Sequence, residues 1–231
     1  IGDVNGDGIN DLLIGPSQMS VGEPFGTLTG NLSAKTYVVF GKTGAATVNL
    51  SGLAVTDGYS ITLDGPRLGF EVSAAGDVNA DGINDFIVSR GLTAIAQGPN
   101  GAFVIYGTTK PVTDIALGMS SAPPSAGFYI SANGPDDNIG YTVGGSGDLN
   151  GDGYDDVVLG AGSYGAGVVF GGPNRTATLA ISSLSQVNST TGFMISGFVN
   201  NATSSNGIAV LDDANGDGLA DLLVAANTGA Y

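Results

Sequence analysis

The sequence predicts an all-β fold built from β-propeller blades of four antiparallel strands. The first observation is a nine-residue loop rich in Asp, Asn and Gly, which occurs four times and begins at Asp3, Asp77, Asp148 and Asp213. The second is a short aliphatic segment directly after each loop, and the third is that no segment combines helical periodicity with helix caps. Repeats of roughly 70 residues with four strands each are typical of blades with long connections.

Each repeat is expected to run in the order strand, acidic loop, strand, connection, strand, connection, strand. The strands before the loops are expected at 69–72, 140–143 and 207–210, and those after the loops at 12–14, 86–88, 157–159 and 222–224. Third strands are expected at 37–41, 103–107 and 167–171, and fourth strands at 58–61, 127–130 and 192–195. These segments are short, apolar and bounded by Gly or Ser, which favours buried strands over helices.

The repeats divide the chain into about three blades' worth of sequence. We expect a blade at about 1–64 that lacks its first strand, complete blades at 68–131 and 139–197, and a half blade at 207–231. A closed propeller needs at least four blades, so we expect the natural protein to continue and to supply the remaining blades. Pro111 to Ala126 and Ala177 to Thr191 are expected to be long connections, where partner recognition would lie if it exists.

The acidic residues are concentrated in the loops. The chain has 21 Asp and Glu against six Lys and Arg, and 14 of these acids lie in or beside the four loops. Clustered carboxylates repel one another unless a cation lies among them, so this distribution implies a metal. A net charge of -15 argues against nucleic acid or an anionic membrane as partner, and no apolar run approaches the roughly 20 residues of a membrane-spanning helix.

The spacing of oxygen-bearing side chains within each loop predicts calcium, with up to four Ca²⁺ ions bound, one per loop. Oxygens recur at positions 1, 3 and 5, a Gly at position 6 permits a sharp turn, a backbone carbonyl is available at position 7, and an Asp closes the loop at position 9. Ca²⁺ takes six to eight oxygen ligands, and such a hard, anionic oxygen set disfavours zinc or copper. The expected ligands are Asp3, Asn5, Asp7, Ile9 and Asp11; Asp77, Asn79, Asp81, Ile83 and Asp85; Asp148, Asn150, Asp152, Tyr154 and Asp156; and Asp213, Asn215, Asp217, Leu219 and Asp221.

The loops differ from an EF-hand, which needs a bidentate Glu at position 12 between two helices. Position 12 is apolar in all four copies and falls inside an expected strand: Ile14, Val88, Leu159 and Val224.

The repeats resemble FG-GAP repeats, which build the propeller of integrin α subunits and occur in many bacterial secreted or surface proteins. The "FG" part matches at Leu68-Gly69-Phe70 and Ile139-Gly140-Tyr141, the "GAP" part at Ile14-Gly15-Pro16 and Leu159-Gly160-Ala161-Gly162, and the closing strands at Val39-Phe40-Gly41 and Val169-Phe170-Gly171. Ser89-Arg90-Gly91 and Ala225-Ala226-Asn227 depart from the "GAP" pattern. The resemblance implies that each loop joins the first two strands of a blade and that the twenty residues named above coordinate Ca²⁺.

The sequence contains no His and no Cys, so the usual general bases and nucleophilic triads are missing and we expect no enzymatic activity. Extracellular Ca²⁺ is commonly plentiful, whereas cytosolic Ca²⁺ is scarce, so loops of modest affinity favour an extracellular or cell-surface location. The resemblance implies a binding or adhesion scaffold whose ligand is an unknown protein or glycan. Two alternatives stay open: a non-catalytic propeller module of a secreted hydrolase, and a carbohydrate-binding propeller.

Overall fold

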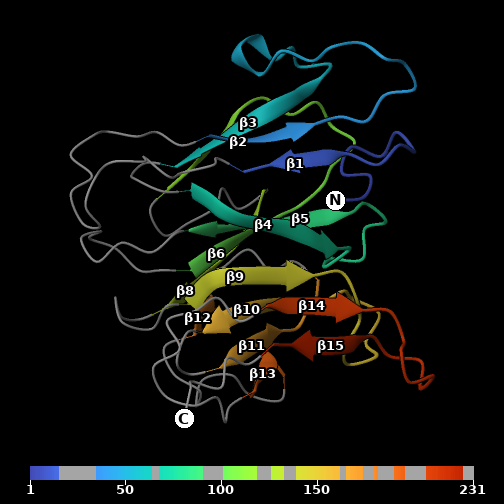
Figure 1. Ribbon diagram of the computed structural model, residues 1–231, viewed down its shortest axis with the longest axis vertical. Coiled ribbons are helices and arrows are strands. Elements are labelled where there is room, and N and C mark those ends of the chain that lie inside the picture. Colours follow the sequence, from blue (N-terminus) through green and yellow to red (C-terminus); the bar gives the residue numbers. More distant parts are fainter. Residues whose placement is uncertain are drawn as a thin grey trace.

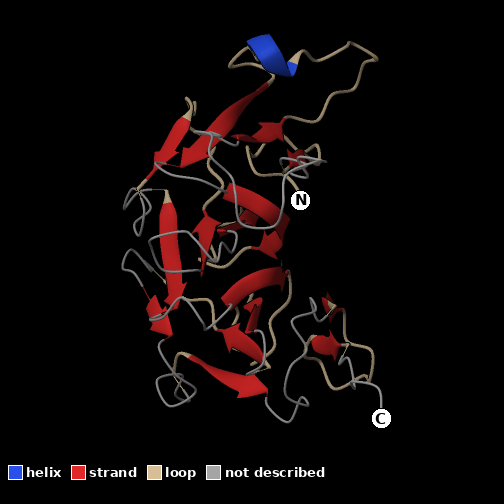
Figure 2. Ribbon diagram, turned by 60° about the vertical axis from the view of Figure 1, so that its left-hand side comes forward, coloured by secondary structure: helices blue, strands red, loops and turns tan. Residues whose placement is uncertain are grey.

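The computed structural model describes residues 1–15, 35–63, 68–90, 101–118, 126–132, 139–161, 165–173, 179–181, 190–195 and 207–225. Within these residues it contains fifteen strands and one 3₁₀ helix, η1 (Leu50–Gly52). The expected all-β class is therefore confirmed. Figure 1 shows that the sheets follow one another along the long axis of the molecule, and Figure 2 shows the short helix at one end, away from the sheets.

The described strands form four sheets. The first has the order β1 (Leu12–Ile14), β2 (Lys35–Val39), β3 (Gly58–Leu63), β7 (Ile115–Leu117). The second has the order β4 (Leu68–Gly76), β5 (Asp85–Arg90), β6 (Gly101–Ile105), β8 (Gly127–Ala132), β12 (Leu179–Ile181). The third has the order β9 (Ile139–Gly145), β10 (Val157–Ala161), β11 (Ala166–Val169), β13 (Gly192–Ile195), and the fourth is the hairpin of β14 (Ile208–Leu211) and β15 (Asp221–Val224).

Four antiparallel strands form the body of each complete unit, where a unit is an acidic loop with the strands that flank and follow it. In the second sheet β4, β5, β6 and β8 pair in this way, with Val88 opposite Phe103 and Phe103 opposite Tyr129. The strands β9, β10, β11 and β13 of the third sheet repeat the pattern. Among the described residues, the first sheet has three antiparallel strands, β1, β2 and β3.

Two short strands, which the sequence did not predict, each join one unit to the unit before it. Strand β7 precedes β8 in the chain but pairs in parallel with β3 of the first sheet, with Leu63 opposite Leu117. Strand β12 pairs in the same way with β8 of the second sheet. The expectation that 111–126 and 177–191 are plain connections is therefore wrong for 115–117 and 179–181. Without these partners, β3 and β8 would be edge strands with unpaired backbone N–H and C=O groups. The parallel strands supply hydrogen-bonding partners along those edges.

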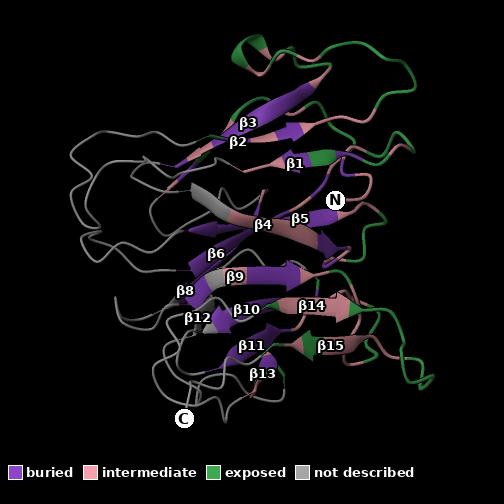
Figure 3. Ribbon diagram, in the orientation of Figure 1, coloured by how far each residue is buried: buried purple, intermediate pink, exposed green. Residues whose placement is uncertain are grey.

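The sheets pack face to face, so the central strands are buried on both sides. Along β5, Phe86 and Val88 belong to the apolar cluster shared with the first sheet, whereas Ile87 belongs to the cluster shared with the third. Along β10, Leu159 packs toward the second sheet and Val158 toward the fourth. Because successive strand residues point to opposite faces, burial on both faces requires continuous apolar runs, which is the pattern in the sequence. Figure 3 shows this buried centre and the exposed loops along one side.

The segments that carry the family resemblance have definite places where they are described. Leu68 and Ile139 begin β4 and β9, the strands that lead into the second and third acidic loops. Five residues of the matching or departing "GAP" segments lie outside the described residues: Pro16, Gly91, Gly162, Ala226 and Asn227.

Candidate metal-binding loops

The four acidic loops occupy equivalent places in the fold. The second loop joins β4 to β5, the third joins β9 to β10, the fourth joins β14 to β15, and the first leads directly into β1. Figure 1 shows all four along the same side of the stack of sheets. Each complete loop therefore connects the first two strands of its unit, as expected.

Hydrogen bonds within the second loop curl the chain around its polar side chains. The Asp81 N–H donates to Asp77 Oδ1 at 3.0 Å and to Asn79 Oδ1 at 2.8 Å, and the Gly82 N–H donates to Asp77 Oδ2 at 2.8 Å. The Ile83 N–H donates to Asp81 Oδ1 at 3.0 Å, and the Asn79 amide donates to Asp81 Oδ2 at 3.2 Å. The same five bonds recur in the other three loops. Positions 1, 3 and 5 are thus brought together by the same ladder each time.

The backbone of the loops requires two left-handed residues. Position 6 is Gly in every copy. Gly82 has a φ of +87°, and a Cβ atom placed there would meet no other atom. The backbone conformation, and not a lack of space, is therefore the reason that this position is a glycine. Position 4 also has positive φ. Three loops place Gly there, but the second loop has Ala80 at a φ of +56°.

The Asp at position 9 ties its loop to the rest of the unit. Asp85 is fully buried; its Oδ2 accepts the Val78 N–H at 3.0 Å and its Oδ1 accepts the Gly107 N–H at 2.8 Å, just after β6. Asp11 and Asp156 make the equivalent pairs of bonds. In the fourth loop, Asp221 keeps the equivalent bond from the Ala214 N–H, and its other bonds come from the backbone and side chain of Asn215. The sequence predicted position 9 only as a ligand, and its hydrogen bonds to the turn after the third strand were missed.

Burial makes the ionised form of the position-9 carboxylate costly in the first three loops. Burial raises the pKa of Asp85 to about 8; hydrogen bonds from the backbone of Gly107 and Val78 act in the opposite direction, and the charges of Asp81 and Asp77 raise it further. Burial likewise raises the pKa of Asp156 to about 6. It also raises the pKa of Asp11, to which the neighbouring Asp7 and Asp3 charges add. A cation in the loop would oppose each of these effects because it stabilises the ionised carboxylate.

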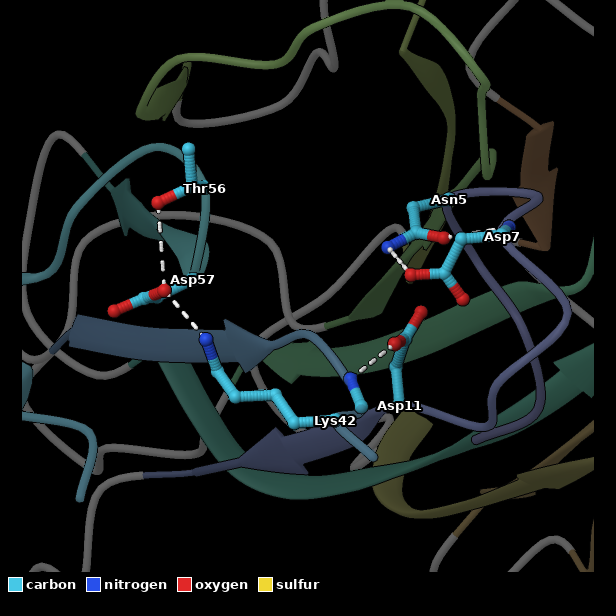
Figure 4. Close-up of polar contacts among 7 residues, drawn as sticks. Asn5, Asp7, Asp11, Lys42, Thr56 and Asp57 are labelled. Carbon is cyan, nitrogen blue, oxygen red and sulfur yellow. Dashed lines mark hydrogen bonds and ion pairs between the residues drawn. The ribbon is translucent and has the colours of Figure 1, made fainter. Parts of the chain in front are cut away.

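The donor set fits a hard cation, although the side chains do not form a finished cage. In the part of the chain that the structure describes, no three His, Cys, Asp or Glu side chains converge as a metal-binding group. The loop carboxylates accept backbone N–H bonds, but a carboxylate offers about four acceptor sites, so capacity for a cation remains at each of them. Figure 4 shows Asn5, Asp7 and Asp11 of the first loop turned toward one region, separate from the Lys42–Asp57 ion pair. An all-oxygen set of this kind suits Ca²⁺.

Successive loops are also bonded to each other across the units. The position-8 N–H of each later loop donates to the position-1 carbonyl of the loop before it: Asn84 to Asp3 at 3.1 Å, Asp155 to Asp77 at 3.1 Å and Ala220 to Asp148 at 3.0 Å. The position-2 carbonyls of Val4 and Val78 accept from Thr108 and Gly172 of the following unit, at 2.9 Å and 2.8 Å. Sequence reasoning missed these bonds because backbone contacts between repeats leave no residue-type signal.

Comparison with protein-family models finds no match, and comparison with curated proteins finds none either. Among the described residues, no helix is both long enough and apolar enough to cross a membrane.

Proposed function

We propose that this chain is a calcium-binding scaffold of FG-GAP-type propeller units that serves binding or adhesion outside the cell. One observation carries the proposal: the same ladder of Asp and Asn oxygens recurs in all four loops, at the same place in each unit. A single loop of this kind could be an ordinary Asx turn. Four equivalent loops, each holding three carboxylates in a short span, favour a shared ligand.

The residues of each loop have separate tasks in this proposal. Positions 1, 3, 5 and 9 supply side-chain oxygens, and Ile9, Ile83, Tyr154 and Leu219 at position 7 supply backbone carbonyls. Calcium, when bound, supplies the positive charge that offsets the repulsion among the carboxylates. Asp11, Asp85 and Asp156 also hold the loop against the turn after the third strand, so binding would stabilise the first three strands of the unit together.

The proposed role is non-enzymatic. The absence of His and Cys from the sequence removes the usual catalytic bases and thiols. Loops of modest calcium affinity work where Ca²⁺ is abundant, which supports an extracellular or cell-surface setting. The proposed ligand is a protein or a glycan, and the strand exchange by β7 and β12 supports further units of the same propeller as neighbours.

Thermal unfolding with and without calcium tests the proposal. We expect Ca²⁺ to raise the melting temperature and a chelator to lower it, because a site filled at 100 times its Kd adds about 2.7 kcal/mol of stability. For a chain of this length each kcal/mol corresponds to roughly 2–4 °C. Mg²⁺ should act more weakly, because it demands a tighter octahedral ligand set.

Calorimetric titration of two variants gives the matched control. Asp81→Asn removes an exposed loop carboxylate and should lower the number of tightly bound Ca²⁺ ions by one. Asp57→Asn removes a half-buried acid outside the loops, one paired with Lys42, and should leave calcium binding unchanged. A melting curve that is the same in Ca²⁺ and in chelator would contradict the proposal.

A further inference from the structure

The second and third loops are joined by a two-point bridge that involves a side chain. The Asp155 N–H donates to the Asp77 carbonyl at 3.1 Å, and Asp155 Oδ2 accepts the Asp77 N–H at 2.8 Å. Asp77 is position 1 of the second loop and Asp155 is position 8 of the third. The first expected calcium ligand of one loop is thus held, through its backbone, by a residue of the next.

The chain contains three versions of this junction. At the first, Asn84 bonds Asp3 through its backbone and through its side-chain oxygen, the latter at 3.2 Å. At the last, Ala220 keeps the backbone bond to Asp148, but its methyl side chain has no acceptor. Only Asp155 brings a charge to the junction. The bridge is therefore charged between the second and third loops, neutral between the first and second, and made by backbone alone between the third and fourth.

The fold leaves room for this carboxylate. Gly76 lies directly before the second loop at a φ of +72°, and a Cβ atom placed there would come within 1.9 Å of Asp155 Oδ2. No real Cβ tolerates such a distance, so the glycine is what allows the carboxylate to reach the Asp77 N–H.

We propose that Asp155 couples cation binding at the second and third loops, so that a cation in one strengthens binding in the other. The proposal rests on the calcium function proposed above. Asp155 acts as a positioning residue, through Asp77 and through its chain neighbour Asp156, and not as one of the expected ligands of either loop.

The coupling takes its positive sign from conformational order, which outweighs the opposing effect of charge. A cation in the second loop fixes Asp77, which fixes the bridge to Asp155, so the third loop loses less conformational freedom when it binds. Charge acts in the opposite direction, because a Ca²⁺ ion in one loop lowers the negative potential at the other. That opposition is limited, because the two loops and Asp155 together hold seven carboxylates. Two Ca²⁺ ions bring four positive charges, so negative charge stays in excess after both have bound.

The third loop offers its own spectroscopic readout. It has Tyr154 at position 7, where the other loops have Ile9, Ile83 and Leu219, and the chain contains no Trp. Tb³⁺ substitutes for Ca²⁺ and emits when a nearby tyrosine is excited. Part of the emission is lost when Ca²⁺ displaces Tb³⁺ and is also absent from Tyr154→Phe. That part of the emission reports the third loop alone.

The test is a double-mutant cycle on the whole chain, read as the Tb³⁺ affinity of the third loop. Asp81→Asn, which alters an exposed residue of the second loop, should weaken that affinity by about fivefold or more when Asp155 is present. In the Asp155→Ala background the same change should cost less than about twofold. Asp155→Asn should keep the bond to the Asp77 N–H, as Asn84 does with Asp3, and should retain part of the coupling.

Controls separate the coupling from a general effect. Asp57→Asn removes a carboxylate that lies outside the loops and pairs with Lys42, and it should leave the third-loop affinity unchanged. Circular dichroism checks that each variant is folded, and Asp155→Asn takes the place of Asp155→Ala in the cycle if the alanine variant is not. Equal effects of Asp81→Asn with and without the Asp155 carboxylate would overturn the coupling alone. Absence of Ca²⁺-displaceable emission from the unaltered chain would overturn the calcium function together with the coupling.

Discussion

Single residues differ among the four loops in ways that alter their energetics. The loops share their hydrogen-bond ladder, but the second has Ala80 where the others have Gly6, Gly151 and Gly216. An L-residue with a side chain in the left-handed region costs roughly 1–2 kcal/mol. The second loop therefore carries strain that the other three avoid.

Ala80→Gly should stabilise the chain. Removing the strain is partly offset by the greater freedom of Gly in the unfolded state, so we expect a net gain of about 0.5–1 kcal/mol in the free energy of unfolding. Urea denaturation at a fixed calcium concentration measures it. Gly82→Ala, in the same loop at a φ of +87°, should change stability in the opposite direction. A loss of stability in Ala80→Gly would show that the left-handed backbone is not strained.

At the scale of elements, the exchanged strands hold the units together. Strand β7 leaves its own unit to pair with β3, and Leu117 at its end is 1% exposed within the cluster shared by the first and second sheets. Its neighbour Ala116 is exposed. The strand thus packs the large side chain of Leu117 into the interface between the two units.

Leu117→Ala should destabilise the chain by about 2–5 kcal/mol, since it removes a buried side chain and leaves a cavity between two sheets. Ala116→Ser in the same strand should change stability by less than about 0.5 kcal/mol. Chemical denaturation of both variants measures the difference. Similar small effects in both would mean that β7 does not contribute to the interface.

On the scale of the whole molecule, negative charge is gathered along one side and partly buried. The raised pKa values of Asp11, Asp85 and Asp156 have the same leading cause, burial, and repeat from unit to unit. For each, the folded chain binds a proton more tightly than the unfolded chain. The contribution of these three groups to stability without calcium is therefore greatest at low pH and is lost as the pH rises.

In chelator, the melting temperature should fall as the pH rises. The fall should begin near pH 4, about the ordinary pKa of an Asp side chain, and continue toward the pKa of about 8 of Asp85. Saturating Ca²⁺ should flatten this dependence, because the cation favours the ionised carboxylates. Melting curves at several pH values, in chelator and in Ca²⁺, measure it. Asp85→Asn should weaken the dependence in chelator. Stability that rises with pH in chelator would contradict the assigned burial of these groups.

Much of the fold could be predicted because its signals are local. The runs around Ile87 and Val158 had to be continuous to be buried on two faces, and the acidic loops mark the turn between the first two strands. Strands β7 and β12 could not be predicted, because three residues hold too little periodicity and their partners are far away in sequence. Calcium binding remains a prediction.

The sequence by itself determined the all-β class, the repeat and the residue types of the loops, since strand burial and loop chemistry follow from the order of neighbouring residues. Only the tertiary structure decided which unit each short strand completes and how the loops meet. Asp155 in the sequence is one further acid of the third loop, but in the fold it accepts the backbone N–H of Asp77 from another unit. Such contacts depend on how the sheets stack, and the positions that make them are separated by a whole repeat.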